Sequence, residues 1–296
     1  MAAEQLVVPD VSNVLVPLDG SELALQVMPT ARVLAQRFDA TLSTISVAAS
    51  DKETDLGRAR VYGAAALDVD PGDDRVCVRT EGEVAQVIGE RAAELGGTVV
   101  CMATHGRGRV SGAFIGSAAR SVVEASPDPV IVLGPAGDNP GWSPRPRDWP
   151  EPLSVPRVVA CVDGSEDSEQ VLPFAAGWAQ ALGMSLTVLT SEEDTPEPLR
   201  PESVRSPYGT DVDAQAYVDA LVERWRPVIG AIEGVVTSDP ISPAGGVQRY
   251  LDQRPAGLVA LTTHARSGMT RAKFGATAAS IVAASVAPCL VAPVRT

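Results

Sequence analysis

The chain contains one sequence unit twice, and this duplication limits the fold more than any other feature. Residues 14–22 (VLVPLDGSE) and 158–166 (VVACVDGSE) are apolar runs that end in Asp-Gly-Ser-Glu, 144 positions apart (158 − 14 = 144). The match continues in QVMP at 26–29 and QVLP at 170–173. A proline within a helix is costly, so its recurrence at one register argues for duplication rather than chance.

A second pair of matched segments closes each copy. THGR at 104–107 corresponds to THAR at 263–266, a separation of 159 positions (263 − 104 = 159). The second copy therefore carries 15 extra residues (159 − 144 = 15), which we expect in the proline-containing loop 191–210. A segment rich in Pro and Gly separates the copies and is typical of a linker. The predicted domains are 1–136 and 156–296, with the linker at 137–155.

Short apolar runs alternate with helical patterns in both copies. Strands are predicted at 13–18, 41–47, 76–80, 99–103 and 130–133, and again at 157–162, 185–190, 234–237, 257–262 and 289–293. In the first copy, helices are predicted at 21–38, 84–95 and 117–124, with a shorter one within 56–67. Runs such as VIVL at 130–133 are apolar on both faces, as in parallel sheets covered by helices. The predicted fold class is α/β, with two tandem doubly wound parallel five-stranded sheets and helices on both faces.

Composition and charge exclude several classes of function. Hydrophobic residues make up 45% of the chain and charged residues 21%, as in globular proteins, and no apolar run is long enough to cross a bilayer. The net charge of −13 argues against nucleic acid or a membrane surface as a partner. Four separate cysteines and two histidines give neither a zinc site nor a redox pair. Because no secretory signal is recognised, we expect a cytoplasmic location.

The ends of the predicted strands indicate where a ligand binds. In a doubly wound sheet, ligands bind beyond the carboxyl ends of the strands. Asp19 follows the first strand, and the glycine-rich segment 106–112 (GRGRVSG) follows the fourth. Gly116 and Ser117 then begin a helix, whose first N–H groups and positive dipole end favour an anion. The sequence therefore predicts an anion site at this edge of the first copy.

This arrangement resembles the universal stress protein family, and the resemblance covers both copies. ATP-binding members of that family carry G-x2-G-x9-G-[ST] after the fourth strand and an aspartate after the first. The first copy has Ala103-x2-Gly106-x9-Gly116-Ser117, with alanine in place of the first glycine. Asp19 matches the aspartate that is expected to meet adenine or ribose.

The second copy departs further from the family pattern. Its segment Thr262-x2-Ala265-x9-Gly275-Ala276 keeps the spacing but lacks the central glycine and the hydroxyl group. Ala265 would hinder close approach of a phosphate, and the side chain of Ala276 cannot form a hydrogen bond. The resemblance therefore implies a degenerate site there, although Asp163 is retained after the first strand.

The resemblance implies ATP as the ligand, with or without Mg²⁺, in a regulatory protein of the stress response. ATP occupancy would then change the packing of the copies or the surface offered to a protein partner, which the sequence does not identify. No catalytic and no metal-binding residue is predicted. The candidate nucleotide-binding residues are Pro17, Asp19, Val47 (through its backbone), Ala103, His105, Gly106, Arg107, Gly108, Gly116, Ser117 and Ala118, with Asp163 and Gly275 in the second copy.

Other interpretations of the same residues stay open. Asp19 and Asp163 could simply form a turn into a helix, and Gly106 and Gly116 could serve backbone geometry alone. His105 could be structural, and the loop arginines could be merely solvated. The chain has neither the G-x4-G-K-[ST] nor the G-x-S-x-G motif, which argues against a P-loop NTPase or an α/β hydrolase. Enzymatic activity is left undecided, because bound Mg-ATP could hydrolyse slowly.

The main alternative is an interaction scaffold in which both sites are vestigial. The resemblance implies pairing through the final strand of each copy, at 130–133 or 289–293. The two copies would pair in this way within one chain, and two chains would pair again as a homodimer.

Overall fold

The structure is a computed structural model of the 296-residue chain. It describes residues 5–48, 50–104, 115–134, 153–193, 213–263 and 274–294. The glycine-rich segment 106–112 lies outside the described residues, as do most of the predicted linker and most of the predicted insertion loop.

The first copy alternates strands and helices in the predicted order. Its strands are β1 (Asn13–Pro17), β2 (Thr41–Val47), β3 (Val76–Arg79), β4 (Thr98–Ala103) and β5 (Val130–Leu133). Its helices are α1 (Glu22–Leu25), α2 (Met28–Phe38), α3 (Glu53–Leu67), α4 (Val84–Leu95) and α5 (Ser117–Ala125).

The second copy repeats this order. Its strands are β6 (Arg157–Cys161), β7 (Ser185–Glu193), β8 (Ile232–Asp239), β9 (Leu258–Thr262) and β10 (Cys289–Ala292). Its helices are α6 (Glu166–Glu169), α7 (Val171–Leu182), α8 (Ala214–Ile229), α9 (Pro243–Gln253) and α10 (Ala276–Ala284). Among the described helices, none is both long enough and apolar enough to span a bilayer.

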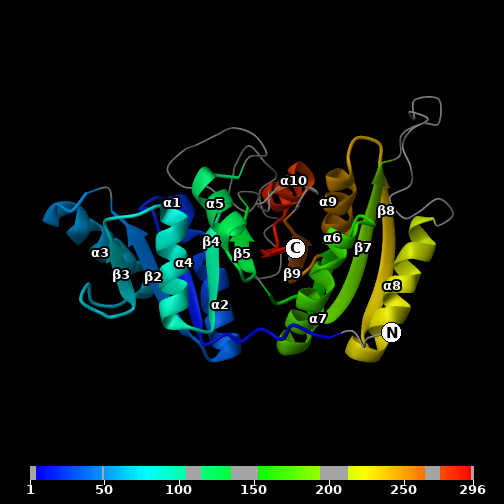
Figure 1. Cartoon of the computed structure of the whole chain (residues 1–296), viewed down its shortest axis with the longest axis horizontal. Coiled ribbons are helices and arrows are strands. Elements are labelled where there is room, and N and C mark those ends of the chain that lie inside the picture. The colour runs from blue at the N-terminus through cyan, green and yellow to red at the C-terminus, as the bar shows by residue number, and fades with distance from the viewer. Residues whose placement is uncertain are drawn as a thin grey trace.

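The strands of both copies form one continuous sheet (Figure 1) in the order β3-β2-β1-β4-β5-β10-β9-β6-β7-β8. Within each copy the neighbouring strands are parallel, and β5 and β10 pair antiparallel where the copies meet, with Ile131 opposite Leu290. The predicted α/β class is confirmed, and so is the predicted pairing of the final strands within one chain. The two five-stranded halves are continuous rather than separate sheets.

The strand register reproduces the sequence repeat. Asn13 pairs with Thr41 in the first copy and Arg157 pairs with Ser185 in the second, a shift of 144 for both partners (157 − 13 = 144; 185 − 41 = 144). The pairing of the fourth strand with the fifth shifts by 159 in the same way (259 − 100 = 159). The extra residues of the second copy therefore lie between these two pairs of strands.

The core consists of two apolar layers, one on each face of the sheet. Successive strand residues point to opposite faces, so Val14 and Val16 belong to one layer and Leu15 to the other. Helices α2, α7 and α8 cover the first layer, and α4, α5, α9 and α10 cover the second. Both layers contain buried residues of both copies.

The helix predicted at 21–38 is wrong in one respect, because the structure divides it into α1 and α2. Pro29 lies in the first turn of α2, and Pro173 is the third residue of α7. The N–H groups of a first helical turn have no partner within the helix, so proline is tolerated there. The repeated proline therefore marks the start of a helix in each copy rather than its interior.

Other boundaries also differ from the prediction. Helix α3 is longer than expected, with 15 residues from Glu53 to Leu67. Strand β7 continues through residues 191–193, which the sequence assigned to the insertion loop, because these residues pair with the long edge strand β8. Leu153, within the predicted linker, is buried in the core layer that contains α7.

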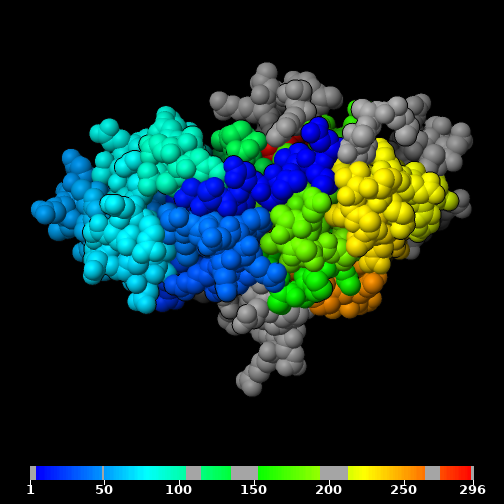
Figure 2. All heavy atoms as spheres, turned by 90° about the horizontal axis from the view of Figure 1, so that it is seen from below, coloured from blue at the N-terminus to red at the C-terminus, as the bar shows by residue number. Residues whose placement is uncertain are grey.

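The N-terminal segment connects the copies (Figure 2), running from β1 across the face of α7 in the second copy. The backbone N–H of Val7 donates to the carbonyl oxygen of Pro173 at 3.0 Å. Nearby, the ring of Phe38 on α2 meets the ring of Trp178 on α7 edge to face, with centroids 5.4 Å apart. These contacts and the β5–β10 pair fix one copy against the other.

Candidate functional site

The same turn follows the first strand of each copy. One carboxylate oxygen of Asp19 accepts hydrogen bonds from the backbone N–H of Ser21 at 3.0 Å and from its hydroxyl at 2.6 Å. Gly20 between them has a φ of 83°, which favours glycine, and the Ser21 hydroxyl accepts from the N–H of Ala24 as the N-cap of α1. Asp163 makes the equivalent bonds to Ser165, at 3.1 and 2.6 Å.

This turn is the one that the alternative interpretation of the two aspartates described. It also explains why Asp-Gly-Ser occurs in both copies, because each residue has a structural task. Asp19 is nevertheless exposed at the carboxyl end of β1, where a ligand can reach it. Its contact with a nucleotide stays a prediction.

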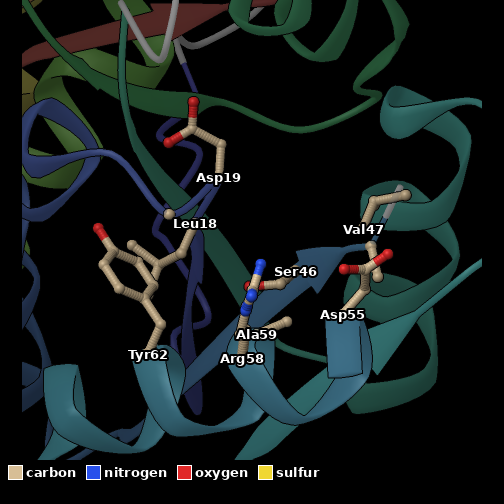
Figure 3. A pocket seen from close by; sticks show the side chains of 10 residues that line it. Leu18, Asp19, Ser46, Val47, Asp55, Arg58, Ala59 and Tyr62 are labelled. Atoms are coloured by element: carbon tan, nitrogen blue, oxygen red, sulfur yellow. The ribbon is translucent and has the colours of Figure 1, made fainter. Parts of the chain in front are cut away.

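A cleft of about 420 Å³ lies at the carboxyl ends of β1 and β2 (Figure 3). Helix α3 forms its opposite wall. Its lining residues are Leu18, Asp19, Gly20, Ser46, Val47, Ala48, Asp55, Arg58, Ala59 and Tyr62. The cleft therefore brings together Asp19 and Val47, the two residues that the resemblance assigns to the adenosine part of ATP.

The side chains of α3 give the cleft its polar character. Figure 3 shows Arg58 and Tyr62 rising from α3 toward the side on which Asp19 lies. The Tyr62 hydroxyl donates a hydrogen bond to the carbonyl oxygen of Ser21, which ties α3 to the turn after β1. Arg58 is exposed and makes no hydrogen bond or ion pair to any described residue. The cleft thus combines apolar walls with the carboxylates of Asp19 and Asp55 and the guanidinium of Arg58.

Sequence reasoning did not identify the contribution of α3. Ser46, Asp55, Arg58, Ala59 and Tyr62 were not among the candidate residues. The available signal was positional, because a helix that directly follows β2 must leave from the edge of the sheet where ligands bind. Arg58 and Tyr62 are spaced i, i+4 and therefore share one face of that helix.

The predicted phosphate-binding residues lie at the start of α5, outside the lining of the cleft. Gly116 is the N-cap of α5, and its N–H donates to the carbonyl oxygen of Thr104 at 2.7 Å, next to the end of β4 at Ala103. Ser117 is the first helical residue and is exposed, as is Ala118. No side-chain hydrogen bond caps the start of α5.

The backbone torsion angles of Gly116 show whether this position requires a glycine. Its φ of −57° and ψ of 149° are open to any residue, so the torsion angles do not require glycine. Glycine is also among the residues favoured at the N-cap of a helix. Pro17 ends β1 on the same rim. His105, Gly106, Arg107 and Gly108 lie outside the described residues.

The second copy has a much smaller cavity at the corresponding edge, of about 60 Å³. Asp163 lines it, together with residues from the ends of β6, β7 and β9 and the first turns of α9 and α10. Thr262 stands where the first copy has Ala103, and it is one of the residues that line this cavity. Gly275 is the N-cap of α10 with a φ of −68°. This cavity is bounded by α9 and α10, whereas α3 closes the cleft of the first copy, so the two copies differ in which elements enclose the cavity.

Metal and thiol chemistry have no visible basis in the part of the chain that the structure describes. No group of three or more His, Cys, Asp or Glu side chains is placed to hold a metal ion there. Burial raises the pKa of the Cys101 thiol, and it raises the pKa of Cys161 and of Cys289 to about 12. These thiols stay protonated at neutral pH and are poor nucleophiles.

The duplicated, doubly wound unit with a cleft at the carboxyl ends of β1 and β2 defines a tandem α/β protein. The sequence model of the Universal stress protein family matches residues 11–134 and 155–293. The chain therefore belongs to the universal stress protein family, with two domains of that family in tandem. A search among curated proteins finds no match.

Solved structures support the same fold over the full chain. A functionally unknown protein from Pseudomonas aeruginosa PAO1 matches with 14% identity and a TM-score of 0.61, covering 96% of this chain and 92% of that chain. A universal stress protein from Archaeoglobus fulgidus DSM 4304 matches with 16% identity and a TM-score of 0.58, covering 95% and 98%.

A single-domain structure is also similar to this chain. It is a universal stress protein from Archaeoglobus fulgidus in complex with dAMP, with 21% identity and a TM-score of 0.36, covering 47% of this chain and 98% of that chain. At that TM-score the bound nucleotide is a property of that protein alone.

Proposed function

We propose that the first copy binds ATP and that the protein is a nucleotide-responsive regulator. The observation that carries this proposal is the cleft of about 420 Å³ in which Asp19 and the end of β2 at Val47 lie together. Small-molecule sites are concave, largely apolar and equipped with a few polar groups, which is the character of this cleft. Its position at the carboxyl ends of the strands supports the same conclusion.

In the proposed arrangement, adenosine lies in the cleft and the phosphates extend along the rim to the start of α5. The N–H groups of the first turn, at Ser117 and Ala118, and the helix dipole would stabilise the negative charge. The glycine at 116 leaves room for a phosphate beside the backbone. His105, Gly106, Arg107 and Gly108 would complete the site, and Mg²⁺ would be held through the phosphates and water.

The second copy is proposed to support the first rather than to bind ATP by itself. Its cavity is about 60 Å³, and Ala276 replaces the serine that begins α5 in the first copy. Asp163 and Gly275 would then keep structural tasks in the turn after β6 and at the start of α10. ATP occupancy of the first copy would change the surface offered to a protein partner in the cytoplasm.

The matched aspartates provide the test. The protein is purified and denatured, released small molecules are identified by mass spectrometry, and Mg-ATP binding is measured by calorimetry. Asp19→Ala and Asp163→Ala each remove two hydrogen bonds to the serine two positions along the chain, so the loss of this turn is common to both variants. We expect Asp19→Ala to weaken ATP binding about tenfold or more, the size of a lost hydrogen bond to a charged group. Asp163→Ala should bind ATP like the parent.

Two outcomes would contradict the proposal. A parent protein that releases no nucleotide and takes up no Mg-ATP would favour the scaffold interpretation, with Ala103 as the first residue to restore to glycine. Equal loss of binding in both variants would place the effect in the fold rather than in the first copy.

A further inference from the structure

A contact between α5 of the first copy and the segment before α10 of the second connects the two candidate sites (Figure 1). The guanidinium of Arg120 donates to the carbonyl oxygen of Phe274 at 3.2 Å. The N–H of Phe274 donates to a carboxylate oxygen of Glu124 at 3.0 Å. Arg120 and Glu124 also pair with each other at 3.6 Å. Both backbone groups of Phe274 are therefore held by side chains of the other copy, and we call this group the Phe274 clamp.

The clamp lies at the start of α10, the helix whose first turns line the second copy's cavity. Phe274 is 3% exposed and packs in the core layer that both copies share. It directly precedes Gly275, the N-cap of α10, and the first turns of α10 line that cavity through Thr277 and Ala278. A hydrogen bond from a backbone N–H to a carboxylate is charge-assisted and among the stronger kinds, so Glu124 fixes where α10 begins.

The clamp exists in one direction only. The residues at the corresponding positions, 159 places along the chain or back, are Ile115 for Phe274, Ala279 for Arg120 and Ala283 for Glu124. Alanine side chains cannot form hydrogen bonds, so Ala279 and Ala283 of α10 cannot hold the backbone of Ile115 as Arg120 and Glu124 hold that of Phe274. The asymmetry makes the second copy depend on the first.

The clamp residues share a face of α5 with the proposed phosphate site. Ser117, Arg120 and Glu124 are spaced i, i+3 and i+7, which places them along one stripe of the helix. Ser117 is at the end of that stripe where the phosphates of ATP are proposed to lie. A ligand that orders the first turn of α5 therefore acts on the helix that carries the clamp.

We propose that Glu124 and Arg120 are positioning residues through which the first copy sets the conformation of the second copy's site, and that ATP in the first copy tightens this clamp. The second part rests on the proposed function, whereas the first part stands on the contacts alone. Through these hydrogen bonds, nucleotide binding in the first copy would change the conformation of the second copy even when the second copy binds no ligand.

The first part is tested on the protein without added nucleotide, by amide hydrogen exchange at Phe274 and along α10. Glu124→Ala removes the acceptor of the Phe274 N–H and should speed its exchange about tenfold or more. Glu124→Gln keeps an oxygen at the same place and should restore most of the protection. As a control, Glu94→Ala removes a carboxylate that pairs only with arginines of the first copy, and α10 should not respond. Unchanged exchange at Phe274 in Glu124→Ala would overturn the positioning role.

The second part is tested with Mg-ATP, by calorimetry and hydrogen exchange on the same samples. Glu124→Ala should still bind ATP, up to about threefold more weakly than the parent, because Glu124 lies outside the proposed site and its removal costs only the coupling. Exchange at Phe274 should slow about threefold or more in the parent only. ATP binding with no change at Phe274 would overturn the coupling and leave the proposed function intact. Absence of ATP binding would overturn the proposed function and the coupling, while the clamp would still stand on the first test.

Discussion

At the scale of single residues, Arg58 is the one cationic side chain among the described residues that line the cleft of the first copy. Arg58 is exposed in the cleft, on a protein whose net charge is −13. We predict that Arg58→Ala weakens ATP binding about three- to tenfold, because a guanidinium over an aromatic base contributes about 0.5–2 kcal/mol. Calorimetry with Mg-ATP measures the change. Arg60→Ala is the matched control, since Arg60 is on the same helix outside the cleft, and an equal loss in both variants would contradict this role of Arg58.

A single glycine allows the N-terminal segment to dock on the second copy. A Cβ atom at Gly177 would lie 2.1 Å from the carbonyl oxygen of Val7, whereas the first copy has Val33 at that position of the repeat (177 − 144 = 33). We predict that Gly177→Val lowers the free energy of unfolding by about 1–3 kcal/mol, the usual effect of overpacking. Urea unfolding measures it.

The control for Gly177→Val is a glycine with open space around it. A Cβ at Gly89 on α4 meets no atom within 4 Å, so Gly89→Ala should raise stability by up to about 1 kcal/mol through helix propensity. Limited proteolysis adds a second measurement, because a displaced N-terminal segment should be cleaved faster. A stable Gly177→Val variant with a protected N-terminus would show that the docking does not need the glycine.

At the scale of elements, Asp239 joins the end of β8 to the start of α9. Its carboxylate accepts from the N–H groups of Ile241 at 2.9 Å and Ser242 at 3.0 Å and pairs with Arg249. The two backbone hydrogen bonds, and then Arg249, hold the pKa of Asp239 below its usual 3.8. A pKa lowered by folding stabilises the fold above the unfolded value, and this contribution is lost as the pH falls through the folded value.

We therefore predict that Asp239→Asn lowers stability at pH 7 and that the difference from the parent is lost as the pH falls through the folded pKa of Asp239, which lies below 3.8. Urea unfolding on either side of that pKa checks this. Asp73→Asn is the control: Arg75 holds the pKa of Asp73 at about 2, but the pair is at the surface. In about 1 M salt the stability difference caused by Asp73→Asn should shrink, because the surface ion pair is screened. The difference caused by Asp239→Asn should largely persist. A pH-independent difference for Asp239→Asn would contradict the assignment.

Elements with a strong local signal could be predicted from the sequence, and the structure confirms them. β2, β5 and α4 have the predicted bounds. The signals for these elements are local in the sequence: a short strand-forming run in each strand, and an amphipathic pattern ended by Gly96 in the helix. The break between α1 and α2 differs from the prediction, because Pro29 stands in the first turn of a new helix and not in the interior of one. The role of Arg58 depended on how α3 packs over the rim, which is tertiary information that no motif carries.

At the scale of the whole molecule, the pairing of β5 with β10 bears on assembly. Universal stress protein domains were expected to pair through their final strands, and here both final strands are paired within the chain on both sides. The predicted homodimer therefore cannot form through these strands. The outermost strands of the continuous sheet are β3 and β8, so any pairing of chains by strand addition would have to use those edges.

The continuous sheet also predicts how the protein unfolds. Because both core layers contain residues of both copies, we expect one cooperative transition in urea. The tryptophans are all at position 142 or later, so their fluorescence reports on the second copy and the linker, while far-UV circular dichroism reports on both copies. The two transitions should coincide in the parent, and separate transitions would mean that each copy folds by itself.

A proline variant at the junction tests the origin of this cooperativity. Ile131→Pro removes an N–H from β5, which pairs with β10 across the junction and with β4, and should separate the fluorescence and dichroism transitions. Val78→Pro is the control in the outer strand β3, which pairs only with β2. It should lower the midpoint while the two signals still coincide. If Val78→Pro separates the signals as well, cooperativity belongs to the sheet as a whole and not to the junction of the two copies.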